Sequence, residues 1–138
     1  MKILAIDFGM KRMGFAVGNT DLRTATPIAP MARQNDRQDI LYLQKLVDEY
    51  DITKIIIGYP LNMDGTKSDF TSRVEDFARQ IKECFAIETE FVDERLTSFE
   101  ADEMLKEFQQ DYKKRKKVLD SVSALVILRS YMESGGAS

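Results

Sequence analysis

Histidine is absent from the sequence. Its absence excludes Ser-His-Asp hydrolysis, cysteine nucleophiles paired with histidine, histidine general bases and histidine metal ligands. Any catalysis must therefore depend on carboxylates, lysines or hydroxyl groups. The single cysteine, Cys84, excludes an internal disulfide and a thiolate zinc cluster, and its helical sequence context predicts a buried, unreactive thiol. A lone cysteine also fits a reducing compartment, so we expect a cytoplasmic protein.

Long apolar runs are missing as well. No signal-peptide segment opens the chain, and no uncharged stretch approaches the roughly twenty residues that cross a bilayer. The most apolar segment is interrupted by Asp120 and Arg129. We therefore expect a soluble protein without a membrane partner. The net charge of -3 gives no general attraction to a polyanion, so any nucleic-acid surface must be a local patch.

The chain has 138 residues, of which 43% are hydrophobic, and this is enough for one domain with a buried core. Hydrophobic periodicity predicts alternating strands and helices, which is typical of an α/β domain. The predicted strands are residues 3–6, 15–17, 23–32, 55–57 and 87–92. The predicted helices are residues 36–50, with Asp36 as the cap, 70–85, 97–108 and a buried helix at 118–132. Two prolines mean that residues 23–32 form either an edge strand or an extended arm, and residues 134–138 predict a flexible tail.

Three acidic residues stand at the ends of predicted elements. Asp7 follows the first strand, Glu94 follows the last strand, and Asp120 lies early in the final helix. Asp7 can also be a turn former, and Asp120 can serve the helix dipole. Placing the first and fourth strands side by side, with the final helix across them, would gather the three carboxylates at one edge of the sheet.

Clustered carboxylates repel one another unless a cation neutralises them. Oxygen ligands without histidine or thiolate select hard ions, so Mg²⁺ or Mn²⁺ is the expected cofactor. Two such ions can position a water molecule and stabilise the leaving oxygen in phosphodiester hydrolysis. The acidic residues therefore predict a divalent-metal site whose chemistry suits phosphodiester hydrolysis.

Candidate phosphate contacts lie in three segments. Two cations occupy the turn after the first strand, one follows Glu94, and a basic run at 113–117 leads into the final helix. Such a run can also be an ordinary solvated surface. In the loop at 58–66, past the end of a strand, an asparagine is placed to position a phosphate or to shape the loop. The candidate substrate-binding residues are Lys11, Arg12, Asn62, Arg95, Lys114, Arg115 and Lys116.

The chain contains, in this order, the motifs IDFGMKRMGFAVG, GYPLNMDGT, VDERLTSFEA and KKRKKVLDSVSALVILRSY. Together these motifs resemble the bacterial YqgF family, also called RuvX, over almost the whole chain. The resemblance implies a ribonuclease-H-like fold, in which helices cover both faces of a mixed five-stranded sheet, and a metal-dependent nuclease site. The acidic positions of the family fall on Asp7, Glu94 and Asp120. Strand alternation lets only one of Asp93 and Glu94 contact a metal directly, and the resemblance favours Glu94.

Members of this family are regarded as Holliday junction resolvases and as nucleases that complete the 5′ end of 16S ribosomal RNA. The leading hypothesis is therefore an endonuclease that acts on structured RNA, with precursor 16S rRNA or a pre-ribosomal particle as the best single guess. Four-way DNA junctions come second, because phosphate contacts dominate either interface and leave no distinguishing motif. We expect a monomer or a weak homodimer.

Two rival hypotheses come from other functional classes. The DFG segment also resembles the phosphate loop of actin-like and Hsp70-like ATPases, but those proteins close two domains around a nucleotide and this chain has room for one. A ribosome-associated binding protein without nuclease activity is the other rival. Retention of all three carboxylates argues against it.

Overall fold

The computed structural model describes residues 1–94 and 112–133, with side chains in the second range from residue 122 onward. Five strands form one mixed sheet in the order β3-β2-β1-β4-β5. β2 pairs antiparallel with β1 and β3, whereas β4 runs parallel to β1 and β5. The strands are β1 (Lys2–Phe8), β2 (Arg12–Asn19), β3 (Thr24–Ala32), β4 (Lys54–Tyr59) and β5 (Glu88–Asp93). The structure confirms the mixed five-stranded sheet, the contact between the first and fourth strands, and the proline-containing edge strand.

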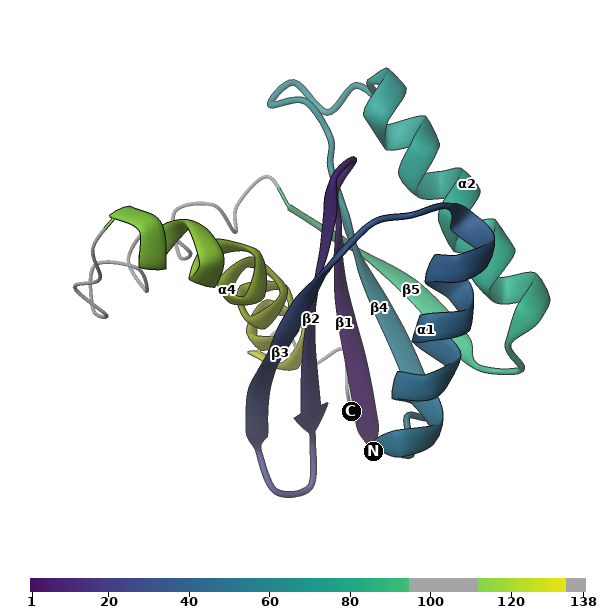
Figure 1. Cartoon of the computed structure of the whole chain (residues 1–138), viewed down its shortest axis with the longest axis vertical. Helices are drawn as coiled ribbons and strands as arrows, with labels where there is room; N and C mark the ends of the chain where they lie inside the picture. Colours follow the sequence, from purple (N-terminus) through teal and green to yellow (C-terminus); the bar gives the residue numbers. More distant parts are fainter. Residues whose placement is uncertain (95–111, 134–138) are drawn as a thin grey trace.

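Helices cover both faces of this sheet (Figure 1). α1 (Asp36–Glu49) and α2 (Asp69–Cys84) lie on one face, and α4 (Tyr112–Glu133) lies on the other. The cap of α1 is Asn35, whose side chain accepts a hydrogen bond from the backbone N–H of Gln38. The predicted cap, Asp36, is instead the first residue of the helix.

The final helix begins at Tyr112 rather than at residue 118, so the basic run at 113–117 belongs to its first turns. Most of its described side chains are buried, as predicted: Val122, Ala124, Leu125, Val126, Ile127, Leu128 and Tyr131. No helix in the described ranges is long and apolar enough to span a membrane. The predicted helix at 97–108 and the predicted tail at 134–138 lie outside the described residues.

Cys84 is exposed, so the predicted buried thiol is wrong. It is the last residue of α2, where helical spacing from Ile81 fits both Cys84 and Phe85. Phe85 takes the place against the core and Cys84 faces solvent.

The sheet separates two apolar cores because side chains alternate along each strand. Leu4, Ile6 and Phe8 of β1 pack toward α1 and α2. Ile3 and Ala5 of the same strand pack toward α4. The end of β1 thus presents successive residues to two different helical layers.

Arg33, which follows β3, connects the start of α1 to the end of β1. Its guanidinium lies 4.3 Å from the ring centroid of Phe8 and forms ion pairs with Asp36 at 2.6 Å and Asp39 at 2.9 Å. The side chains of Arg33 and Asp39 are 7% and 1% exposed. Burial would raise the pKa of Asp36, but hydrogen bonds from Gln80 and Arg33 bring that pKa below its usual value.

Replacing Arg33 with alanine is expected to lower the free energy of unfolding by about 3 kcal/mol, because the buried carboxylate of Asp39 loses its ionic partner. Arg79→Ala is the control: Arg79 pairs with Asp76, their side chains are 67% and 37% exposed, and its loss should cost less than about 1 kcal/mol. Urea unfolding followed by circular dichroism measures both values. Equal losses in the two variants would contradict the prediction.

Candidate active site

Asp7 and Gly58 lie next to each other on neighbouring parallel strands. The residues that precede them, Ile6 of β1 and Ile57 of β4, are paired in the sheet and both pack toward α1 and α2. Because side chains alternate along a strand, Asp7 and Gly58 face the other side, which α4 covers. The carboxylate at the end of β1 is therefore directed away from the larger core.

Glu94 reaches the same face from the end of β5. In the pairing of β4 with β5, Gly58 lies beside Val92, and Val92 packs in the core beneath α4. Glu94 comes two residues after Val92, so it faces the same side of the sheet. Its backbone N–H donates to the carbonyl of Tyr59 at 3.1 Å. Asp93 lies between Val92 and Glu94 in sequence and pairs with Tyr59, so it faces the other side of the sheet.

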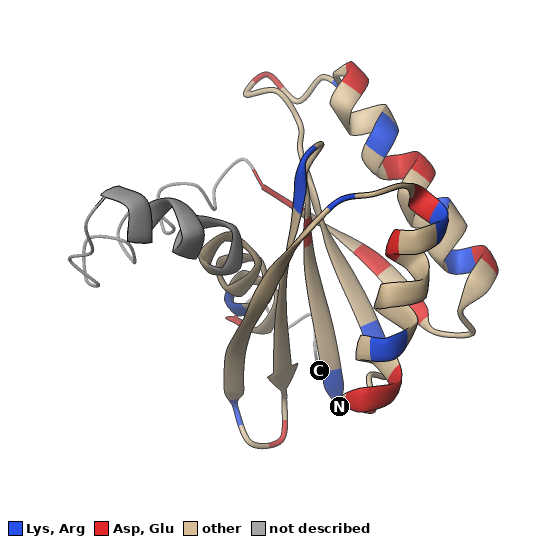
Figure 2. Ribbon diagram, viewed as in Figure 1, with Lys and Arg blue, Asp and Glu red and all other residues tan. Residues whose placement is uncertain are grey.

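The carboxyl groups of Asp7 and Glu94 are hydrogen-bonded to each other, and both residues are partly buried. Burial raises the pKa of Glu94 to about 8, with further contributions from the charge and hydrogen bond of Asp7 and the charge of Asp93. Without a cation, the pair therefore retains a proton near neutral pH. Figure 2 shows the acidic ends of β1 and β5 near the basic turn between β1 and β2.

Gly58 provides the space in which the two carboxyl groups meet. A Cβ atom at this position would overlap Oε1 of Glu94 and would lie 2.6 Å from its Cδ. The same atom would lie 2.7 Å from Cδ1 of Ile127, on α4. Any larger residue must therefore displace Glu94 or the helix. This role of Gly58 was not predicted from the sequence, although a glycine that ends a run of isoleucines is a signal for close approach of other groups.

The raised pKa of Glu94 predicts that stability depends on pH in metal-free buffer. The folded chain keeps a proton that the unfolded chain releases near the ordinary value of 4.5. The contribution of Glu94 to stability is therefore greatest below that pH and falls as the pH rises toward about 8, by at most about 1.4 kcal/mol per pH unit. Thermal unfolding between about pH 5 and about pH 8 measures this slope.

The matched variant for this measurement is Glu94→Gln, in which the slope should flatten. Added Mg²⁺ should restore stability to the unmodified chain at the upper end of the range, because a cation replaces the proton. Equal slopes in the unmodified and Glu94→Gln chains would contradict the assignment of the effect to this pair.

Asp120 lies within α4, about two helical turns before Ile127. Its side chain is outside the described part of the chain, so its membership of the site stays a prediction. Among the side chains that the structure describes, no three acidic or cysteine groups are gathered to hold a metal ion. The described site is thus the pair formed by Asp7 and Glu94.

The cations predicted to bind phosphate divide into two groups. Lys11 lies in the turn between β1 and β2, and Arg12 is the first residue of β2; both are exposed, at the end of the sheet where Asp7 lies. The backbone of this turn is held by Arg33, whose N–H donates to the carbonyl of Lys11 at 2.9 Å. Arg95 and the side chains of Lys114, Arg115 and Lys116 fall outside the described residues.

Asn62 shapes the loop between β4 and α2. Its side-chain amide donates to Oγ1 of Thr66 at 2.9 Å, and its backbone N–H donates to the carbonyl of the same residue. Oδ1 of Asp64 accepts hydrogen bonds from the backbone N–H and the hydroxyl of Thr66. Of the two roles predicted for Asn62, the structure therefore shows the loop-shaping one.

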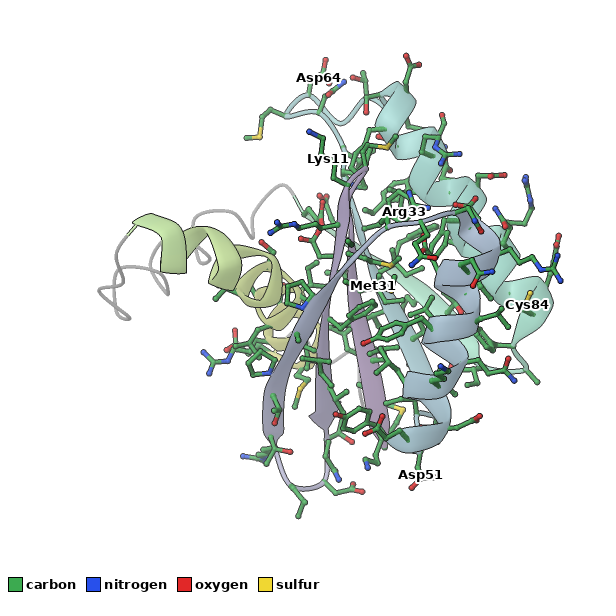
Figure 3. All side chains as sticks on the ribbon, viewed as in Figure 1. Lys11, Met31, Arg33, Asp51, Asp64 and Cys84 are labelled. Atoms are coloured by element: carbon green, nitrogen blue, oxygen red, sulfur yellow. The ribbon has the colours of Figure 1, made fainter. Side chains whose placement is uncertain are left out.

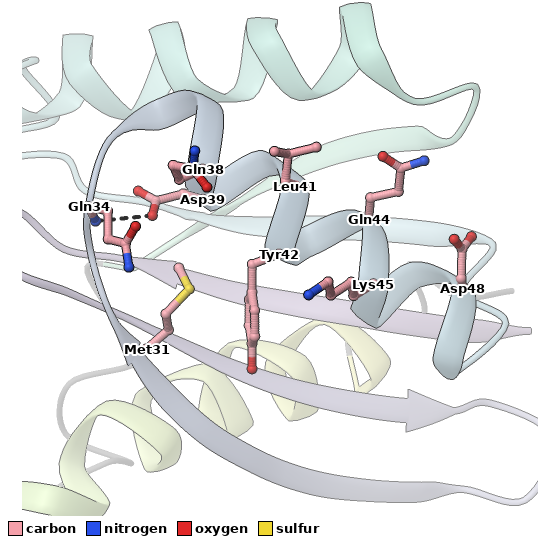
Figure 4. Close-up of a pocket in the computed structure, with 9 residues that line it drawn as sticks. All are labelled: Met31, Gln34, Gln38, Asp39, Leu41, Tyr42, Gln44, Lys45 and Asp48. Carbon is pink, nitrogen blue, oxygen red and sulfur yellow. Dashed lines mark hydrogen bonds between the residues drawn. The ribbon is translucent and has the colours of Figure 1, made fainter.

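A groove of about 590 Å³ lies between α1 and the end of β3 (Figure 4). Met31, Tyr42 and Lys45 are among the residues that line it. Met31 and Tyr42 pack against the core of the α1 and α2 face. The groove is therefore on the opposite side of the sheet from Asp7 and Glu94 and is not part of the candidate active site.

A family model described as RuvX, Holliday junction resolvase, matches residues 1–134. The chain belongs to the RuvX family. A relative from Syntrophomonas wolfei is 36% identical over 135 residues, which cover 98% of this chain and 96% of the relative. A relative from Escherichia coli O157:H7 (strain EC4115) is 41% identical over 134 residues and covers 96% of each chain. Both relatives are named "Putative pre-16S rRNA nuclease".

Solved structures place the RuvX chain in the ribonuclease-H-like class that the resemblance implied. The fowlpox virus resolvase, solved with Holliday junction DNA, aligns with a TM-score of 0.62 and 18% identity over 97% of this chain and 98% of that chain. Thermus thermophilus RuvC with a Holliday junction substrate aligns with a TM-score of 0.61 and 9% identity, over 98% and 97%. At these identities, the shared feature is the fold.

Proposed function

We propose that the chain is a cytoplasmic nuclease that hydrolyses phosphodiester bonds in structured nucleic acid, with Asp7 and Glu94 at its active site. The observation that carries this proposal is the contact of the two carboxyl groups over Gly58, at the edge where three strands end. Membership of the RuvX family supports the reaction class. Asp120 completes the proposed site from α4.

The chemistry of the two carboxyl groups fits a hard divalent cation. Side by side and partly buried, they share a proton in the absence of a counter-charge, and oxygen donors of this kind select Mg²⁺ or Mn²⁺. Asp7, Glu94 and Asp120 are the residues proposed to hold two such ions. The bound ions would supply a water molecule that is nucleophilic at neutral pH and positive charge beside the leaving oxygen.

The surrounding residues have separate tasks in this proposal. Lys11 and Arg12 attract the phosphates on either side of the cleaved bond. Arg95 and the basic run at 113–117 are proposed to contact further phosphates. Ile127, next to the carboxyl of Glu94, limits access of bulk water from the side of α4.

The proposed substrate is the 5′ region of precursor 16S rRNA, free or within a pre-ribosomal particle, because the similar curated relatives carry that name. Four-way DNA junctions are the second candidate, because the family model is described as a Holliday junction resolvase. The phosphate-binding cations serve either substrate.

A paired cleavage assay tests the proposal. The chain is incubated with precursor 16S RNA and with a four-way DNA junction, each with Mg²⁺, with Mn²⁺ or with chelator. We expect metal-dependent cleavage of the RNA. Cleavage of the junction alone would select the second candidate, and tight binding without cleavage of either substrate would favour a ribosome-associated binding protein.

A charge-removal variant tests the phosphate-binding surface. Replacing Lys114, Arg115 and Lys116 with alanine should weaken RNA binding and reduce the slope of log affinity against log salt by about 0.7 to 0.9 for each lost phosphate contact. The matched control removes three exposed cations of α1 and α2: Arg37, Lys45 and Lys82. Fluorescence anisotropy at several salt concentrations gives both slopes. Equal changes in the two variants would indicate that the run at 113–117 is an ordinary solvated surface.

A further inference from the structure

We infer that the side chains of Met10 and Met63 bind unstacked bases of the nucleic-acid substrate. The backbone of the same strand would lie at Asp7 and Glu94. We call these two residues the methionine pair. This inference rests on the proposed nuclease function. It adds that the protein also binds the faces of bases, through the methionine pair, and not the phosphates alone.

The first observation is where exposed apolar side chains occur. Among the described residues, five large apolar side chains are exposed: Met1, Met10, Leu22, Leu41 and Met63. Met10 is 58% exposed in the turn that follows β1, and Met63 is 79% exposed in the loop that follows β4. Because β1 and β4 are parallel, both turns lie at the end of the sheet where these strands terminate, which is also where the carboxyl pair lies. Figure 3 shows their chain neighbours, Lys11 and Asp64, at that same end.

The second observation is that the loop holding Met63 is fixed while its side chain is left in solvent. The backbone N–H of Gly65 donates to the carbonyl of Asn62 at 2.8 Å, and Gly65 has a φ of 88°, which glycine adopts without strain. The Asn62 and Asp64 side chains both bond to Thr66. Apolar surface presented by an ordered loop costs little further ordering when a ligand binds.

The turn that presents Met10 is also closely built. A Cβ atom at Gly9 would lie 2.5 Å from the carbonyl oxygen of Arg12, so the turn has no room for a side chain at this position. The carbonyl of Lys11 accepts a hydrogen bond from Arg33 at 2.9 Å. Met10 is thus an exposed apolar side chain on an ordered turn, beside the cations proposed to bind phosphate.

The chemistry of the side chain selects the ligand. A thioether is polarizable and adaptable and packs well against aromatic rings, which is the character of a base face. Base faces are covered in a continuous duplex and are available in single strands, bulges and branch points. The methionine pair should therefore favour a substrate with unpaired nucleotides next to the cleaved bond over a continuous duplex.

The test compares two synthetic RNAs, a hairpin with a single-stranded 5′ extension that carries 2-aminopurine and the same sequence as a full duplex. The double variant Met10→Gln and Met63→Gln keeps side-chain size and adds polarity, whereas Met10→Leu and Met63→Leu keeps the apolar character. Leu22→Gln and Leu41→Gln, 71% and 49% exposed, are the control. Affinities and 2-aminopurine fluorescence are measured for each chain.

We expect the Met10→Gln and Met63→Gln double variant to bind the extended hairpin about tenfold more weakly and to lose the fluorescence change, while duplex affinity stays the same. The Met10→Leu and Met63→Leu double variant and the control should match the unmodified chain. Unchanged binding by the Met10→Gln and Met63→Gln double variant, or an equal loss on both RNAs, would overturn the inference and leave the nuclease proposal intact. Failure of the unmodified chain to bind either RNA or a four-way junction would instead overturn the proposed function itself.

Discussion

Gly58→Ala is expected to reduce cleavage at least about 100-fold, because the added methyl group occupies the space of the Glu94 carboxyl and moves it away from Asp7. Misplacement of a catalytic group by about 1 Å is enough for a loss of this size. Cleavage is measured at saturating substrate, where the effect should appear in kcat. Circular dichroism should show an intact fold.

The chain offers a matched control for this variant in Gly18, on β2. A Cβ atom there would lie 2.9 Å from Cδ2 of Leu128, so Gly18→Ala also crowds α4, but against the end of a flexible side chain and not against a carboxylate. This variant should retain most activity. In the double variant Gly58→Ala and Glu94→Asp, the shorter acid relieves the overlap, and partial recovery over Gly58→Ala is expected. Full activity of Gly58→Ala would contradict the role assigned to this glycine.

Asp7→Asn is expected to abolish cleavage and to raise stability in metal-free buffer. The amide cannot provide the negative charge that a divalent cation requires. Without the charge of Asp7, one cause of the raised Glu94 pKa is lost, so less folding free energy is spent on keeping Glu94 protonated at neutral pH. The stability gain should be on the order of 1 kcal/mol, since active sites commonly sacrifice stability for function. Thermal unfolding in chelator measures the gain, and the gap between the two chains should narrow or reverse when Mg²⁺ is added.

The control for Asp7→Asn is Asp51→Asn. Asp51 lies at the far end of the molecule from Lys11 (Figure 3) and has a φ of 53°, a conformation that asparagine also accepts. This variant should change neither cleavage nor metal response. A metal-free melting temperature for Asp7→Asn below that of the unmodified chain would contradict the stability cost assigned to the Asp7 charge. Robust cleavage by Asp7→Asn in chelator would reject the metal-dependent mechanism.

Much of the fold could be predicted from the sequence because its signals are local. The isoleucine run of β4 and the prolines of β3 each constrain one strand without reference to the rest of the chain. Errors occur where two neighbours compete for one role. Asn35 and Asp36 can both cap a helix, and Cys84 and Phe85 both fit the spacing of α2. In each case tertiary contacts decide the outcome.

Prediction of the candidate site from the sequence has a different limit. Asp7 and Glu94 could be selected from the sequence because each stands at the carboxyl end of a predicted strand, and the structure brings the two together. The role of Gly58 depends on register: Ile6 beside Ile57, and Gly58 beside Val92. Register across parallel strands is fixed by long-range packing and has no signature within either strand. The roles of Asp120 and of the basic run stay predictions.

The exposed thiol of Cys84 gives the molecule one built-in attachment point. As the only cysteine of the chain, it can carry a single maleimide dye or spin label without any substitution. It ends α2, on the face of the sheet opposite the carboxyl pair and at a distance from Lys11 (Figure 3). A dye at this point can report rotational slowing or energy transfer to a labelled RNA while the active-site face remains untouched.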